Sequence, residues 1–224
     1  MIEFIDIDRR LLKAAKDYRL LLDHGYNREF ALRFVGDKYR LNELERKILY
    51  RSIHPTYKAI NTFRKRLHPY EVKDRVLAID FYNTIITIDS GYLDSVQLYL
   101  GNDFFIRDMR GIHGRISAME SKLINHFKTL ANFLIRFNPA KVYVFLESQI
   151  SKSGYLASKI RSITNKSKYE IKVVKHVDKE LIKYSVVASS DSIIHEYAIN
   201  VVDLPFYIFQ NINKVIKVYD LSSI

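Results

Sequence analysis

Apolar residues in the first third of the chain recur at the three- and four-residue spacing of amphipathic helices. Gly25 and Gly36 follow two of these segments as stop signals, and Asn27 precedes the second as an N-cap. The predicted helices cover residues 8–24, 28–36 and 43–53, followed by a further helix and a linker over residues 54–73. We therefore expect a basic, all-helical N-terminal domain over residues 1–74.

The pattern changes at Arg75, where VLAIDFYNTIITID forms a continuous apolar, β-branched run typical of a strand buried in a parallel sheet. A long helix is predicted over residues 115–137. Further strands are predicted at residues 142–146, 171–174, 185–188, 201–202 and 215–218. Because strands and helices alternate, residues 75–224 should form a three-layer α/β/α sandwich around a mostly parallel sheet.

Composition narrows the class of protein. An apolar content of 48% excludes a disordered chain, and no apolar run approaches the ~20 residues that span a bilayer. The acidic start MIEFIDIDRR does not resemble a signal peptide, so we expect a soluble cytoplasmic protein. The absence of cysteine excludes thiolate zinc sites and cysteine nucleophiles. A metal would have oxygen or imidazole ligands, and carboxylates would favour Mg²⁺ or Mn²⁺.

The net charge of +11 predicts a polyanionic partner, since cations that neutralise phosphates release counterions. Residues 1–75 hold 18 Lys and Arg against 11 acids, and residues 76–224 hold 18 against 14. The basic residues that we expect to contact nucleic acid are Arg64, Lys65, Arg66, Lys152, Lys159 and Arg161. The alternative is that the helical domain serves docking or homodimerisation and that its charges are solvated.

Four acids follow apolar runs that predict strands. They are Asp80, Glu147, Asp178 and Asp191. If these strands are neighbours, the four carboxylates converge at the carboxyl edge of the sheet, where α/β proteins bind ligands. A divalent cation would keep such carboxylates ionised together and would suit phosphodiester hydrolysis. The alternative is that each acid is an ordinary helix cap or turn residue.

Residues 75–210 resemble the PIN-like nuclease superfamily, in particular its NYN-type branch. The motifs are IDFYNTI with Asp80 and Asn83, VFLESQISKSG with Glu147, KHVDKEL with Asp178, and VASSDSIIHE with Ser190 and Asp191. The resemblance implies an acidic metal-binding cluster in which the serine before the last aspartate orients it. Glu147 departs from the aspartate that is common at its position.

The whole chain is also similar to a group of archaeal and bacterial proteins in which a helical domain of unknown function precedes a PIN-like domain. The helical domain is identified from LLDHGYNREFALRFVGDKYRLNELERKILYR. The group carries an acidic segment resembling NDFFIRDMRG, which adds Asp103, Arg107 and Asp108 as candidate site residues.

The leading hypothesis is a metal-dependent endoribonuclease in which Asp80, Glu147, Asp178 and Asp191 bind Mg²⁺ or Mn²⁺, with RNA favoured over DNA. The second hypothesis is a nucleic-acid-binding or regulatory protein that uses a degenerate PIN-like fold without cleavage. A third is a phosphotransferase, because DFYNT faintly resembles a D-x-D-G-T loop. That loop would need its second aspartate at Tyr82, so this hypothesis lacks a proton-transfer group.

Overall fold

A computed structural model describes residues 1–95, 97–110 and 119–224. Its larger sheet has five parallel strands in the order β6-β5-β2-β7-β8, so the predicted mixed α/β fold with a parallel sheet is confirmed. The strands are Val76–Asp80 (β2), Lys141–Glu147 (β5), Tyr169–Val174 (β6), Val186–Ala188 (β7) and Asn200–Val201 (β8). The early apolar run at Val76 thus forms the central strand.

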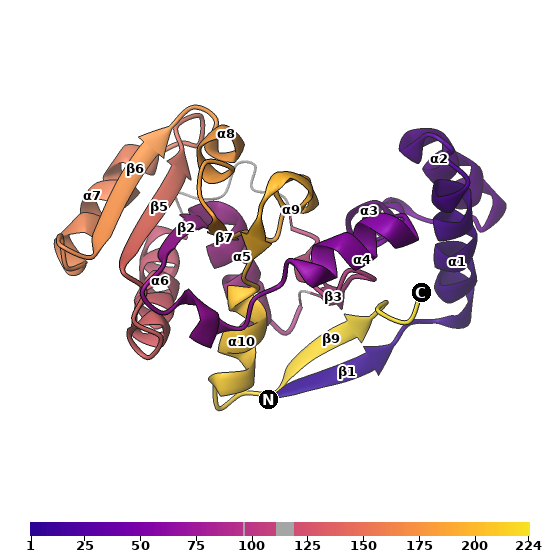
Figure 1. The fold of residues 1–224 in the computed structure, drawn as a ribbon. Coiled ribbons are helices and arrows are strands. Elements are labelled where there is room, and N and C mark those ends of the chain that lie inside the picture. Colours follow the sequence, from indigo (N-terminus) through magenta and orange to yellow (C-terminus); the bar gives the residue numbers. More distant parts are fainter. Residues whose placement is uncertain (96, 111–118) are drawn as a thin grey trace.

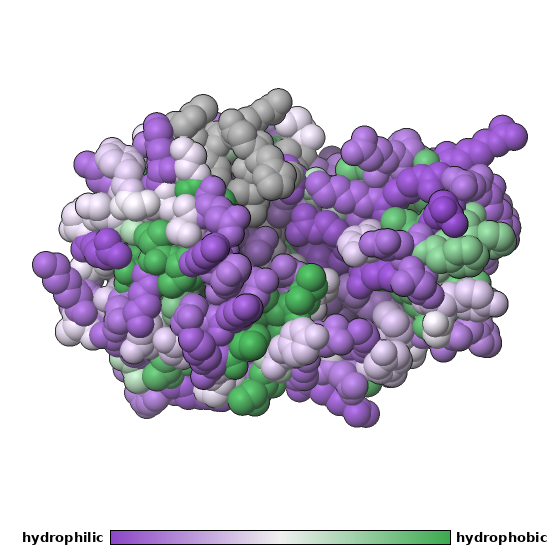
Figure 2. Space-filling model, turned by 90° about the horizontal axis from the view of Figure 1, so that it is seen from above, coloured by the Kyte–Doolittle hydropathy of each residue, from purple (hydrophilic) through white to green (hydrophobic). Residues whose placement is uncertain are grey.

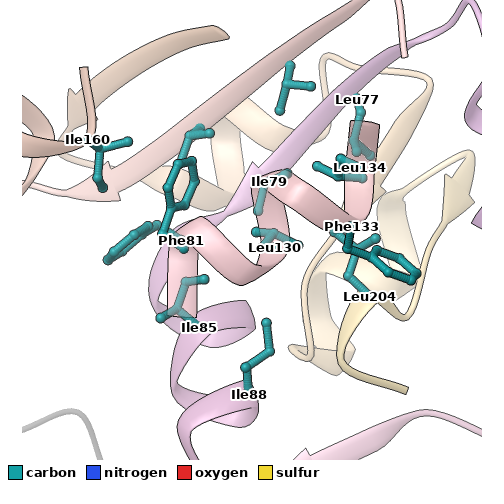
Figure 3. Close-up of a cluster of buried hydrophobic side chains, with 14 of the residues drawn as sticks. Leu77, Ile79, Phe81, Ile85, Ile88, Leu130, Phe133, Leu134, Ile160 and Leu204 are labelled. Carbon is teal, nitrogen blue, oxygen red and sulfur yellow. The ribbon is translucent and has the colours of Figure 1, made fainter. Parts of the chain in front are cut away.

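Helices cover both faces of this sheet because side chains of β2, β5 and β7 point alternately to either side. The helices on one face are Phe81–Gly91 (α5), Glu120–Ile135 (α6), Ser153–Ile163 (α7) and Leu204–Asn211 (α10). Those on the other are Val177–Leu181 (α8) and Ser192–Tyr197 (α9). Figure 3 shows side chains of the first core, among them Ile79 of β2, Leu130 of α6 and Ile85 of α5.

A second sheet contains residues from both ends of the chain. Its order is β1-β9-β3-β4, and β1 pairs in parallel with β9. The strands are Ile2–Asp6 (β1), Leu98–Leu100 (β3), Ile106–Asp108 (β4) and Ile216–Asp220 (β9). Figure 1 shows β1 and β9 side by side. The prediction of an all-helical segment 1–74 is therefore wrong at its start, because Ile2–Asp6 completes a sheet whose other strands come from residues 98–220.

Four helices follow β1, close to the positions predicted from the apolar pattern. They are Arg9–Asp23 (α1), Arg28–Lys38 (α2), Glu43–Ser52 (α3) and Thr56–Arg64 (α4). Gly36 does not end α2 as predicted. It lies under the Arg46 guanidinium, which a Cβ at this position would approach to 2.1 Å. A 3-10 turn at Pro69–Val72 then leads into β2.

The long helix predicted over residues 115–137 corresponds to α6 in its described part. Residues 115–118 of that prediction lie outside the described residues. Among the residues that the structure describes, no helix is long and apolar enough to cross a membrane.

The C-terminal residues pack into the core of the N-terminal helices. Leu221 is fully buried there, with Tyr18 of α1 and Leu49 of α3 in the same cluster. The helical part therefore depends on the last residues of the chain as well as on its own helices.

We expect Leu221→Ala to lower the free energy of unfolding by about 2–5 kcal/mol, the usual effect of emptying a buried leucine site. Equilibrium urea denaturation measures the change, with Val215→Ala as control because Val215 is 54% exposed. Equal stabilities of the two variants would contradict the packing of the C-terminus described here.

Candidate functional site

Asp80 ends the central strand β2 and directly caps α5, with no loop between the two elements. Its Oδ1 accepts a hydrogen bond from the backbone N–H of Asn83 at 3.2 Å, and its Oδ2 accepts one from the Asn83 side-chain amide at 2.6 Å. The carboxyl group is buried. The predicted D-x-x-N pair therefore lies together at the carboxyl end of the sheet, with Asn83 orienting Asp80.

Burial is the main influence on the charge of Asp80 and raises its pKa to about 6. The hydrogen bonds from Asn83 and Ser189 act against this shift, and the nearby Asp191 carboxylate adds to it. Ionising this carboxyl group therefore costs more free energy than ionising one in water, and a nearby cation would lower that cost.

The turn after β7 brings a second set of polar groups to Asp80, because β7 is paired directly with β2. Ser189 Oγ donates to Asp80 Oδ2 at 3.1 Å and accepts from the Asp191 backbone N–H at 3.1 Å. Ser190 Oγ instead donates to the Asn83 carbonyl at 3.0 Å. The serine that contacts Asp80 is therefore Ser189, one residue before the predicted Ser190.

Asp108, at the end of β4, joins this group through Thr87 of α5. The Thr87 hydroxyl lies 2.9 Å from Asp108 Oδ2 and 3.2 Å from Ser190 Oγ. Asp108 is buried and also accepts from the Arg110 backbone N–H at 2.8 Å. The structure thus places the predicted supporting residue Asp108 beside the β2–β7 edge.

Glu147 ends β5, the other neighbour of β2. Its Oε2 lies 3.4 Å from the Val177 backbone N–H, whereas its buried Oε1 has no hydrogen-bond partner among the described residues. Asp178, in the first turn of α8, is exposed to solvent. Glu147 therefore offers an unpaired carboxylate oxygen near the sheet edge, while Asp178 lies at the surface.

The four predicted metal ligands do not gather into one preformed site. Across residues 1–95, 97–110 and 119–224, no group of three or more acidic or imidazole side chains is placed to hold a metal. Asp80 and Asp191 are linked through Ser189, whose hydroxyl donates to Asp80 and accepts from the Asp191 backbone N–H. Glu147 lies at the end of the adjacent strand β5.

Asp103 belongs to a different cluster from Asp80. It forms a bidentate ion pair with Arg107, with N–O distances of 2.7 and 2.5 Å, and both side chains are 1% exposed. Burial alone would raise the pKa of Asp103, but the Arg107 guanidinium holds it well below its usual range. His195 connects the two clusters, since its Nε2 lies 2.7 Å from the Ser189 carbonyl and its Nδ1 lies 3.4 Å from Arg107.

Several basic residues predicted to contact nucleic acid already have partners within the protein. Arg161 donates to the Ile171 carbonyl, Lys152 pairs with Glu120, and Lys65 donates to two carbonyls at the end of α9. The Arg66 guanidinium lies over the rings of Phe206, Tyr207 and Phe105. Arg64 and Lys159 are exposed. Four of the six side chains therefore already contact other groups of the protein.

Sequence reasoning missed Thr87, Ser189, His195 and His54. Thr87 lies one helical turn after Asn83, so a polar residue inside the apolar run IITI was a signal for it. His54 and His195 lie far apart in the sequence and meet only through Asp103, at 3.5 and 3.9 Å. No local pattern indicates that contact.

Comparison with known proteins assigns the chain to a family. Residues 69–207 match a domain of unknown function (DUF5616), and residues 10–65 match a protein of unknown function (DUF434). An uncharacterized protein of Methanocaldococcus jannaschii is 33% identical over 186 residues, which cover 81% of this chain and 87% of that protein. No solved structure matches. The chain therefore belongs to the DUF5616 family.

Proposed function

We propose that the α/β part of this protein is a PIN-like nuclease domain that hydrolyses RNA with Mg²⁺ or Mn²⁺ at the Asp80–Asp191 edge of the sheet. The observation that carries the proposal is a buried Asp80 with a raised pKa at the carboxyl end of β2, joined through the Ser189 hydroxyl to the turn after β7 that carries Asp191. This is the edge where α/β sheets bind ligands. Perturbed carboxyl groups of this kind gather at functional sites.

The residues fit a divalent cation that binds together with substrate. Mg²⁺ is commonly held by one or two carboxylates, with water and substrate phosphate oxygens completing its shell. Asp80 and Asp191 would supply the carboxylates, and the unpaired Oε1 of Glu147 is a further oxygen donor. When bound, the metal would lower the pKa of an attacking water. Asp178 stays a predicted ligand, although its exposure makes it the weakest of the four.

The protein's own groups would position this chemistry. Asn83 and Ser189 hold Asp80 Oδ2 from two sides, which fixes the direction of the carboxylate. The Thr87 hydroxyl contacts both Asp108 and Ser190, so the Asp108 carboxyl group lies next to the edge of the sheet that carries Asp80 and Asp191. These contacts preorganise the site before substrate binds.

The second candidate function is nucleic-acid binding without cleavage. No group of three or more metal-binding side chains is found among the described residues, which is what a PIN-like site that has lost its metal ligands would show. This observation favours binding without cleavage. The phosphotransferase hypothesis has less support, because Tyr82 lies within α5 with its hydroxyl bonded to Ser153.

Cleavage of labelled single-stranded RNA in Mn²⁺ tests the proposal. We expect Asp80→Asn and Asp191→Asn each to lower the rate on the order of a hundredfold or more, because each removes a carboxylate that would hold the metal. Asp94→Asn, at a carboxylate with a 95% exposed side chain, should cleave like the wild type. If the wild type binds RNA but does not cut it with either Mg²⁺ or Mn²⁺, the nuclease proposal is wrong and nucleic-acid binding without cleavage is the function that remains.

The pH dependence of stability tests the burial of Asp80 without any metal. Its folded pKa of about 6 lies above the ordinary 3.8, so the folded state holds the extra proton between these values. Stability should therefore fall as pH rises from 4 to 6. Asp80→Asn removes this dependence. In EDTA, the free energy of unfolding of this variant relative to that of the wild type should therefore increase by up to roughly 3 kcal/mol between pH 4 and 7.5. Urea denaturation at each pH measures the difference in free energy of unfolding between the variant and the wild type. A difference that does not change with pH would contradict the raised pKa of Asp80.

A further inference from the structure

A cavity of about 410 Å³ lies between α4 and α9, outside the Asp80 site. Its lining includes Arg28, His54, Tyr57, Lys65, Ser192 and Glu196. The first four belong to the part of the chain that matches DUF434, and the last two to the part that matches DUF5616. The volume falls within the roughly 300–1,000 Å³ of small-molecule sites. Neither matched part encloses this cavity alone.

The acids of the lining already have cationic partners. Asp103 pairs with Arg107, and Glu196 pairs with Lys58 at 2.7 Å. Arg28 has no carboxylate partner among the described residues. It donates to the Tyr50 carbonyl, and its Nε is buried without a hydrogen-bond acceptor. The guanidinium also stacks over the Tyr50 ring, 4.4 Å from its centroid, so the cavity wall holds a cation that no described carboxylate neutralises.

His54 is a second unsatisfied group in the same wall. The residue is 5% exposed, and its Nε2 makes no hydrogen bond in the described structure, although Asp103 Oδ2 lies 3.5 Å away. Burial lowers the pKa of His54 to about 3, with Arg107 and Arg28 contributing, so the ring is neutral. Both side chains line the cavity. The N–H groups of a guanidinium and an imidazole suit an anionic oxygen.

Tyr57 gives the cavity an aromatic rim. It is 60% exposed, and Asn61 and Thr62 of the same helix add neutral polar groups to the lining. An exposed tyrosine ring stacks on nucleobases. Hydrophilic residues also dominate the face of the molecule in Figure 2.

We propose that this cavity binds a nucleoside monophosphate unit, with the phosphate toward Arg28 and His54 and the base on Tyr57. The unit is a free nucleotide or one residue of an RNA strand. Neither Asp80 nor Asp191 lines the cavity, so the proposal stands whether or not those residues bind metal. Ser192 directly follows Asp191, so a strand seated here would run past the candidate active site.

Isothermal titration of the full chain in EDTA, with the four nucleoside 5′-monophosphates, tests the proposal. We expect Arg28→Gln to weaken binding roughly tenfold or more and Tyr57→Ala at least about fivefold, since they remove a charged donor and a stacking ring. The matched controls Arg33→Gln, on the same helix as Arg28, and Tyr70→Ala, 65% exposed, should bind like wild type. Unfolding midpoints identify any variant that is not folded. If Arg28→Gln does not fold, Tyr57→Ala still decides the test, because Tyr57 is exposed and its replacement should not disturb the fold.

Two further probes distinguish the source of the nucleotide. If a short single-stranded RNA displaces the mononucleotide and Arg28→Gln weakens both, the cavity holds a residue of a strand. If only the mononucleotide binds, the ligand is free. Wild type that binds no nucleotide, affinities unchanged in folded Arg28→Gln and Tyr57→Ala, or inorganic phosphate that binds as tightly as nucleotides would overturn the proposal.

Discussion

The buried ion pair between Asp103 and Arg107 fixes the β3–β4 turn where it meets His54 of the helical part. Two charges that are 1% exposed are costly to desolvate, and the bidentate geometry offsets this only while both partners stay in place. The space is tight, since a Cβ on Gly101 would lie 2.7 Å from both side chains and 2.8 Å from the Ser52 carbonyl of α3. The β3–β4 turn is thereby held against the helical part.

The same ion pair reaches the candidate active site through a short polar path. His195 lies beside Arg107 and contacts the Ser189 carbonyl, and the Ser189 hydroxyl donates to Asp80. On the other side, Asn102 exchanges two hydrogen bonds with the backbone of His54, which lines the cavity. A continuous chain of polar contacts therefore connects the helical part to Asp80.

Sequence patterns predicted the parts of the fold that are encoded locally. The apolar runs predicted β2, β5, β6 and β7; Asp80 is the last residue of β2, and Asp191 lies three residues after β7. The second sheet was predicted only in part. The strand expected at residues 215–218 corresponds to β9, whereas Ile2–Asp6 was not predicted as a strand and pairs with a segment more than 200 residues away. The Asp103–His54 contact is missed for the same reason. Long-range pairing leaves no periodic signal in either segment.

A raised pKa does not by itself identify a functional carboxyl group, as Asp203 shows. It is buried with a raised pKa, yet Arg66 lies 4.0 Å away and two backbone N–H groups donate to it. Its role is to join β4 to the start of α10. No cation among the described residues contacts Asp80, and the Asp191 carboxylate adds to the rise in its pKa. Asp80 and Asp191 also cap α5 and α9, so folding gives each carboxylate a role. Their common place at the carboxyl edge of the sheet is what supports the proposed cation.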